Sequence, residues 1–172
     1  MKPTIEQLEP QPIVGIRLPV VQSEIGNRIG ELMPELMQHA GDRFTGVVLA
    51  RWHSWEGDRG DMELAVTVRE PMQKSGRIEP AELPACRAAV FLHVGSYDGL
   101  AAAWIASKEW LETEGCARSE EAPWEAYLSD CSVVPEAELQ TQIVWPLAEE
   151  TDPHQRHRGG PTGIASEPST PP

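Results

Sequence analysis

Residues 63–72 (ELAVTVREPM) and residues 138–147 (ELQTQIVWPL) repeat one another in the two halves of the 172-residue chain. Both begin with Glu-Leu, continue with a short strand pattern and reach a proline at the same position. The glycines that end two helix-like segments, Gly41 and Gly115, recur at nearly the same spacing. An internal repeat of this kind predicts that the fold is a duplication.

Outward from these stretches, each half contains a helix with an extended segment before it. Residues 23–40 and 96–114 have polar starts, helical apolar spacing and glycine stops. Pro34 lies inside the first helix and predicts a kink or a division there. The expected strands are residues 12–21, 46–53 and 62–69 in the first half and 85–94, 124–129 and 139–145 in the second.

The order strand, helix, strand, strand, found twice, predicts an α+β fold of duplicated β-α-β-β units. We expect a curved, largely antiparallel sheet with two helices on one face and a central ligand cleft between the halves. This domain should cover residues 1–148, with halves at about 4–73 and 77–148. Residues 149–172 are rich in proline and poor in large aliphatic side chains, so we predict a disordered tail.

The formal net charge of −13 disfavours direct binding to nucleic acid or to anionic membranes. It attracts cationic ligands weakly, and it also serves simply to keep a protein soluble. No apolar run is long enough for a transmembrane helix, and the N-terminus lacks a signal-peptide pattern. Three widely spaced cysteines without a CxxC motif predict free thiols in the cytoplasm.

The sequence contains none of the common phosphate-binding, metal-binding or nucleophile motifs. We therefore expect no cofactor and no metal ion. No segment predicts a helix-turn-helix beyond the two helices that the fold needs, so a DNA-reading element is not expected either.

Residues 123–130 (PWEAYLSD) are the most informative segment for function. On a strand, Glu125, Tyr127 and Ser129 share one face. A carboxylate beside aromatic rings in a crevice suits an organic cation, because charge attraction, apolar area and cation–π contact add together. The same pattern also fits an exposed strand glutamate beside structural aromatic residues.

Tryptophan is unusually frequent, with six residues against two phenylalanines and two tyrosines. Large amphipathic rings favour binding pockets as well as cores. Trp52 and Trp55 end a strand of the first half and Trp104 lies on the second helix, so each can belong to the pocket or to the core. Two others are predicted to be core residues, namely Trp110 and Trp145.

The segment from His93 to Tyr97 (HVGSY) joins a strand to the second helix. His93 could act as an acid or base near neutral pH, or it could stabilise the turn. Tyr97 could point into the cleft or cap the core.

Together these residues resemble the signature of GyrI-like domains, which are also the effector-binding domains of AraC- and MerR-type multidrug regulators. The resemblance covers about residues 4–148 and is most specific in the second half. Ser96 and Cys131 stand where the family commonly has proline. The matching positions are residues 93–100 (HVGSYDGL), Trp110-Leu111, Gly115, residues 125–128 (EAYL), Pro135 and Glu138-Leu139.

The resemblance implies a multispecific aromatic pocket in which Glu125 binds cationic drugs and Tyr127 lines the wall. We therefore expect binding of hydrophobic, often cationic aromatic small molecules, and no direct contact with nucleic acid. The ligand-binding residues would be Glu125, Tyr127, Trp52, Trp55, Trp104, Tyr97 and His93.

The resemblance also implies two alternatives. Some members hydrolyse cyclopropane-bearing alkylating compounds, and here Glu125, Tyr127 and Tyr97 would be the catalytic residues of such a hydrolase. Other free-standing members resemble gyrase inhibitory protein, so the chain could be a protein-interaction module that protects gyrase.

Overall fold

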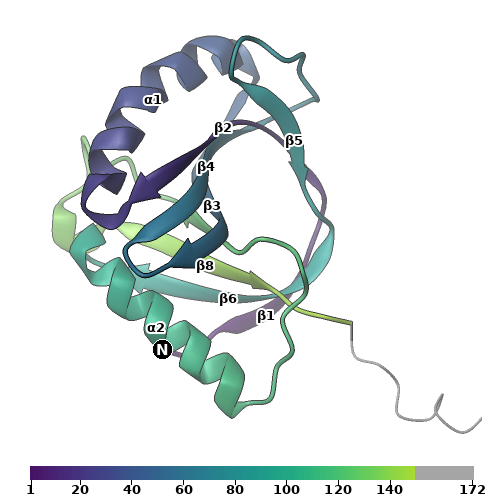
Figure 1. Ribbon diagram of the computed structural model, residues 1–172, viewed down its shortest axis with the longest axis vertical. Helices are drawn as coiled ribbons and strands as arrows, with labels where there is room; N and C mark the ends of the chain where they lie inside the picture. Colours follow the sequence, from purple (N-terminus) through teal and green to yellow (C-terminus); the bar gives the residue numbers. More distant parts are fainter. Residues whose placement is uncertain (150–172) are drawn as a thin grey trace, which may run out of the picture.

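The computed structural model describes residues 1–149 and shows an α+β fold, in which one curled antiparallel sheet carries two helices on one face (Figure 1). The strands are β1 (Thr4–Leu8), β2 (Gln11–Val21), β3 (Phe44–Glu56), β4 (Arg59–Val68), β5 (Glu79–Leu83), β6 (Cys86–Val94), β7 (Trp124–Tyr127) and β8 (Gln140–Pro146). The helices are α1 (Ile25–Ala40) and α2 (Leu100–Thr113), with short 3-10 turns η1 (Gln22–Glu24), η2 (Gly41–Arg43), η3 (Tyr97–Gly99) and η4 (Glu136–Glu138). The predicted tail lies outside the described residues, apart from Glu149.

The strand order β1-β6-β8-β7-β3-β4-β2-β5 confirms the duplicated fold. The order is symmetric about the central pair of β7 and β3, so that β8 matches β4 and β6 matches β2. Burial follows the same pattern along β2 and β6 when Ile13 is matched to Ala88. All six strands expected from the sequence are present, with ends shifted by a few residues.

Two strands that hydrophobic periodicity did not predict, β1 and β5, complete the symmetry. β1 is the first strand of the first half but pairs with β6 of the second, and β5 is the first strand of the second half but pairs with β2 of the first. The first strand of each half therefore pairs with a strand of the other half. Both strands are short and mostly exposed, so they carry little of the alternation that marks a strand in sequence.

The repeated Glu-Leu stretches do not occupy equivalent positions in the two halves. Ile13 pairs with Thr67 in the first half, and its counterpart Ala88 pairs with Pro146 in the second. Thr67 is thus the structural counterpart of Pro146, whereas the sequence alignment matches Pro146 to Pro71. The register differs because a tight hairpin joins β3 to β4, while a longer connection that includes η4 joins β7 to β8.

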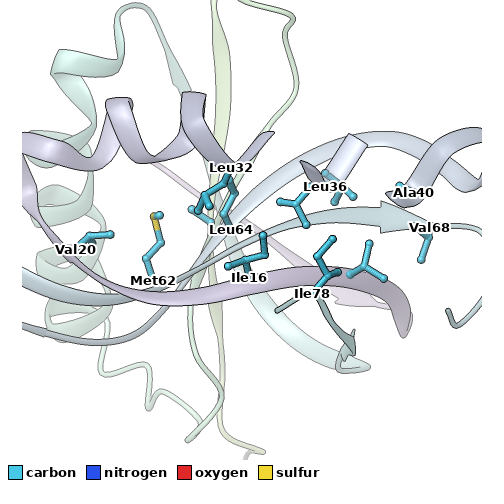
Figure 2. Close-up of a cluster of buried hydrophobic side chains, with 12 residues drawn as sticks. Ile16, Val20, Leu32, Leu36, Ala40, Met62, Leu64, Val68 and Ile78 are labelled. Atoms are coloured by element: carbon cyan, nitrogen blue, oxygen red, sulfur yellow. The ribbon is translucent and has the colours of Figure 1, made fainter. Parts of the chain in front are cut away.

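Side chains of successive strand residues alternate between two buried faces. On the helix face, one cluster packs beneath α1 (Figure 2) and a second beneath α2. A third cluster lies on the opposite face and includes Leu83 of β5, with Leu8 of β1 packed against it. Since β1 and β5 lie at opposite ends of the strand order, the sheet must curl around this third cluster to bring them together.

Helix α1 runs unbroken through Pro34, so the helix is not divided there. Pro34 lies on the exposed side, while Leu32 and Leu36 are buried against the sheet. Burial of each such leucine contributes roughly 1.5–3 kcal/mol, which outweighs the local cost of one proline when several of them share the stripe. Neither α1 nor α2 combines the length and apolar character that a membrane-spanning helix requires.

Candidate functional site

Glu125 lies on β7, at the centre of the strand order and between the two helix-face clusters. Tyr127 and Trp52 pack against the cluster beneath α1, and Trp104 packs against the cluster beneath α2. The residue directly opposite Glu125 on β3 is Ala50, which places only a methyl group beside the carboxylate. Glu125 is 5% exposed, so the interpretation of an exposed strand glutamate does not describe its surroundings.

Both carboxylate oxygens of Glu125 accept hydrogen bonds from aromatic side chains. The indole Nε1–H of Trp104 donates to Oε1, and the hydroxyl of Tyr127 donates to Oε2 at 2.7 Å. The indole N–H of Trp52 is buried and has no hydrogen bond of ordinary geometry among the described residues. It nevertheless lies close enough to act on Glu125 as a third, weaker donor.

Burial raises the pKa of Glu125 above its ordinary value, because the carboxylate loses its hydration. The donors Tyr127, Trp104 and Trp52 act in the opposite direction, as does His93, but they do not outweigh burial. Burial also raises the pKa of Tyr127 well above its usual range, and the nearby Glu125 adds to this effect. Tyr127 is therefore a protonated donor at neutral pH, and Glu125 is a carboxylate whose charged form is disfavoured.

Tyr97 and His93 lie at the edge of this cluster. The ring of Tyr97 meets that of Tyr127 edge-on at 5.5 Å, and Tyr97 is 37% exposed. Burial raises the pKa of Tyr97, with Cys131 and then Asp130 and Glu125 adding to the effect.

The ring of His93 holds the turn that leads into α2. Its Nε2–H donates to the carbonyl of Ser96 at 2.9 Å, and since a carbonyl only accepts, this nitrogen carries the proton. A Cβ at Gly99 would lie 2.8 Å from Cε1 of His93, so glycine is needed there. The contacts are those of a turn-stabilising histidine that also acts electrostatically on Glu125.

The remaining tryptophans take different places. Trp55 is 42% exposed, meets Trp52 edge-on at 5.3 Å and donates to the carbonyl of Gly57. It therefore reaches the Glu125 cluster only through Trp52. Trp145 is buried against Trp104, which confirms the prediction that it is a core residue. Trp110 is half-buried and packs edge-on against Phe91 at the edge of the same cluster.

A cavity of about 470 Å³ adjoins the aromatic cluster, but Glu125 does not line it. The residues that line it include two tryptophans, Trp52 and Trp145, and two arginines, Arg51 and Arg118. Sequence reasoning did not single out either arginine, because nothing in the local pattern distinguishes them from solvated surface charges. Among residues 1–149, no group of histidine, cysteine, aspartate and glutamate is arranged to hold a metal ion.

Comparison with known proteins agrees with this architecture. The family model for the GyrI-like small molecule binding domain matches residues 1–148. The chain therefore belongs to the GyrI-like family and is a small-molecule-binding domain. No curated protein matches it in sequence.

Solved structures share the fold at low sequence identity. The C-terminal domain of EcmrR has a TM-score of 0.76 and 22% identity, over 86% of this chain and 97% of that one. In the EcmrR–DNA complex, where the TM-score is 0.76 and the identity 23%, the match covers 85% of this chain but only 57% of EcmrR. This chain thus spans little more than half of that regulator.

Two further structures match this chain over nearly the whole of their own length. SAV2435, solved with tetraphenylphosphonium, has a TM-score of 0.67 and 15% identity over 87% of this chain and 95% of that one. A hydrolase from Listeria innocua has a TM-score of 0.55 and 11% identity over 86% of this chain and 92% of that one. At these identities the likeness concerns the fold alone.

Proposed function

We propose that this chain binds amphipathic aromatic cations, with Glu125 as the counter-charge. The observation that carries the proposal is a buried carboxylate whose hydrogen-bond donors, Trp104 and Tyr127, are both neutral. Among the described groups that act on its pKa, His93 is the one that can carry positive charge. An ionised carboxylate at such a position is costly unless it is paired, so a ligand cation relieves that cost on binding.

The surrounding rings supply the rest of the binding energy. Trp104, Tyr127, Trp52 and Tyr97 offer apolar area and the negative faces of their π-systems, which attract organic cations. These side chains now fill the space beside Glu125, so binding requires some of them to move. SAV2435, which shares the fold, is bound to tetraphenylphosphonium, a cation of this class, and that supports the proposal.

Isothermal titration of tetraphenylphosphonium into the full chain, at a pH of about 8, tests this function. We expect saturable binding that weakens by about tenfold or more in Glu125→Gln, which corresponds to roughly 1.4 kcal/mol. The neutral probe triphenylphosphine oxide should bind both proteins alike. Affinity for the cation should fall as the pH is lowered through the raised pKa of Glu125, because protonation removes the counter-charge.

The matched control is Glu82→Gln, which removes the same charge from an exposed position on β5. It should leave the affinity for tetraphenylphosphonium unchanged. An equal loss of affinity in both variants would show that the effect comes from net charge alone. No binding of tetraphenylphosphonium by the wild type would exclude a cation pocket at Glu125.

A hydrolase is the second candidate, favoured by the pairing of a high-pKa carboxylate with a tyrosine hydroxyl. Glu125 would deprotonate a water molecule that attacks a carbon of the cyclopropane ring and breaks the strained C–C bond, and Tyr127 or Tyr97 would donate a proton to the substrate atom that receives the electron pair of that bond. The Listeria innocua neighbour described as a hydrolase shares this fold. Turnover of a cyclopropane-bearing alkylating substrate that is lost in Glu125→Gln would establish it, and binding without turnover would exclude it for that substrate.

The gyrase-protecting role stays a prediction, supported here only by the acidic surface. A complex with gyrase that survives Glu125→Ala would show that a partner uses the outer surface.

The three cysteines are free, which supports the proposal that the chain acts in a reducing compartment such as the cytoplasm.

A further inference from the structure

The cavity of about 470 Å³ lies between β3 and β8, beside the residues that precede β7. Arg51 of β3 and Val144 of β8 are the last residues that pair with Trp124, the first residue of β7. Beyond them β3 and β8 continue without a strand between them. The cavity is therefore open to side chains from both faces of the sheet.

A segment of chain, residues 118–123, bridges this gap and is fixed at both ends. The backbone N–H of Trp52 donates to the carbonyl of Pro123 at 2.9 Å, which ties the bridge to β3. The backbone N–H of Ser119 donates to the carbonyl of Pro146 at 3.0 Å, which ties it to β8. Backbone hydrogen bonds thus hold residues 118–123 in place against both β3 and β8.

Arg51 enters this cavity as a buried cation with incomplete pairing. It is 7% exposed, and its Nη1 donates to Glu63 at 3.2 Å. Glu63 is shared, because it also accepts from His53 at 2.9 Å. Among residues 1–149, the buried Nε of Arg51 has no hydrogen-bond partner, and Nη2 approaches Glu121 only to 3.9 Å. A guanidinium group in this state has donors left for a second anion.

A second cation and two indole rings also line the cavity, together with Glu120 and Glu121. Arg118 is exposed and lines the cavity, and its guanidinium carbon lies 5.3 Å from the centre of the Trp145 ring. Trp52 lines the cavity from β3. Rings beside two guanidinium groups match a flat aromatic ligand with a carboxylate, since arginine binds carboxylates through paired donors.

We propose that this gap is a second ligand site, separate from Glu125, which binds aromatic carboxylates. The ring of the ligand packs against Trp52 and Trp145, and its carboxylate meets Arg51 and Arg118. Glu121, whose side chain is 50% exposed, occupies part of the anion position and competes with the ligand. The volume lies within the range of small-molecule pockets, roughly 300–1,000 Å³.

Titration of 2-naphthoate into the full chain at low salt, about 50 mM, tests the site. We expect wild type to bind 2-naphthoate at least about fivefold more tightly than the neutral 2-naphthamide. Arg118→Gln should weaken naphthoate binding by about fivefold or more, while Glu121→Gln should strengthen it by about twofold or more, because it removes the competing carboxylate. Arg77→Gln, which removes the same charge from an exposed position beside Glu35 of α1, should leave the affinity unchanged.

Equal affinity for naphthoate and naphthamide, no binding by wild type at millimolar concentration, or equal effects of Arg118→Gln and Arg77→Gln would each overturn the proposal. Glu125→Gln separates the two sites. It should leave naphthoate binding intact while weakening tetraphenylphosphonium, and loss of naphthoate in that variant alone would assign the probe to the Glu125 cluster instead.

Discussion

At the scale of one residue, Glu125 is notable as a buried carboxylate that is hydrogen-bonded only to neutral groups. The carboxylate accepts from two aromatic donors, which satisfies its oxygens, but no cation neutralises it among the groups that hydrogen-bond to it. Hydrogen bonds to neutral donors offset only part of the lost hydration. The pKa of Glu125 therefore stays raised.

The raised pKa of Glu125 predicts how Glu125→Gln changes stability with pH. The folded protein holds the proton more tightly than the unfolded chain, so this stabilisation is complete below the ordinary glutamate pKa. It is lost as the pH rises through the folded pKa. Glutamine cannot ionise, so the melting temperature of the variant minus that of wild type should increase from a pH of about 4 to about 8.

Thermal unfolding across that pH range measures the difference, with Glu82→Gln as the exposed control. The control should show no such rise. A difference for Glu125→Gln that is constant with pH would mean that the carboxylate titrates normally.

At the scale of elements, one buried serine links α2 to β8. The Oγ of Ser107 donates to the carbonyl of Trp104 and accepts from the indole N–H of Trp145 at 2.8 Å. Ser107 is fully buried. This contact fixes the helix that carries Trp104, and hence one of the two donors to Glu125, against the sheet.

Ser107→Ala should lower the free energy of unfolding by about 1–3 kcal/mol, because it leaves the buried indole N–H of Trp145 without an acceptor. Chemical denaturation monitored by circular dichroism measures this. Thr113→Ala also removes a side-chain hydroxyl from α2, one that donates to the carbonyl of Glu109 at an exposed position, and it should cost far less. Similar losses in both variants would contradict the role assigned to Ser107.

Helix α1 carries an unfavourable residue that its apolar face compensates. Pro34 cannot donate to the carbonyl of Gly30, and its ring crowds that turn. Since Pro34 is exposed and Leu32 and Leu36 hold the helix to the sheet, Pro34→Ala should raise the free energy of unfolding by about 1–3 kcal/mol. Gln38→Ala, another exposed position on α1, should change it by less than about 0.5 kcal/mol. A destabilised Pro34→Ala would show that the packing of α1 needs the proline.

At the scale of the whole molecule, the exchange of leading strands ties the halves together. β1 covers the edge of β6, and β5 covers the edge of β2. The exchange leaves short, mostly exposed strands at both ends of the sheet. Short edge strands of this kind limit pairing with other chains.

Deletion of residues 1–9 should therefore lower the melting temperature and cause concentration-dependent association, because it uncovers the edge of β6. Light scattering after size-exclusion chromatography, at several protein concentrations, measures the association. Deletion of residues 1–3 alone removes no strand residue and should behave as wild type. A shortened chain that stays monodisperse at every concentration would show that the uncovered edge is protected by other means.

The sequence by itself determined the elements that depend on local pattern. The apolar stripes of α1 and α2, the strands β2, β3, β4, β6, β7 and β8, and the duplication follow from periodicity, capping and turn chemistry, which act between near neighbours. The segments around His93 and Glu125 indicated the family in the same way. Trp110 and Trp145 were assigned to the core because large rings are most often buried.

Only the tertiary structure decided which distant residues meet. The pairing of β1 with β6 and of β5 with β2, the shifted register of β8, and the gap that gathers Arg51, Arg118 and Trp145 all depend on long-range contacts. The same holds for the closure of aromatic side chains around Glu125. Such contacts are set by how the sheet curls and how its faces pack, and no local pattern of residue types encodes that geometry.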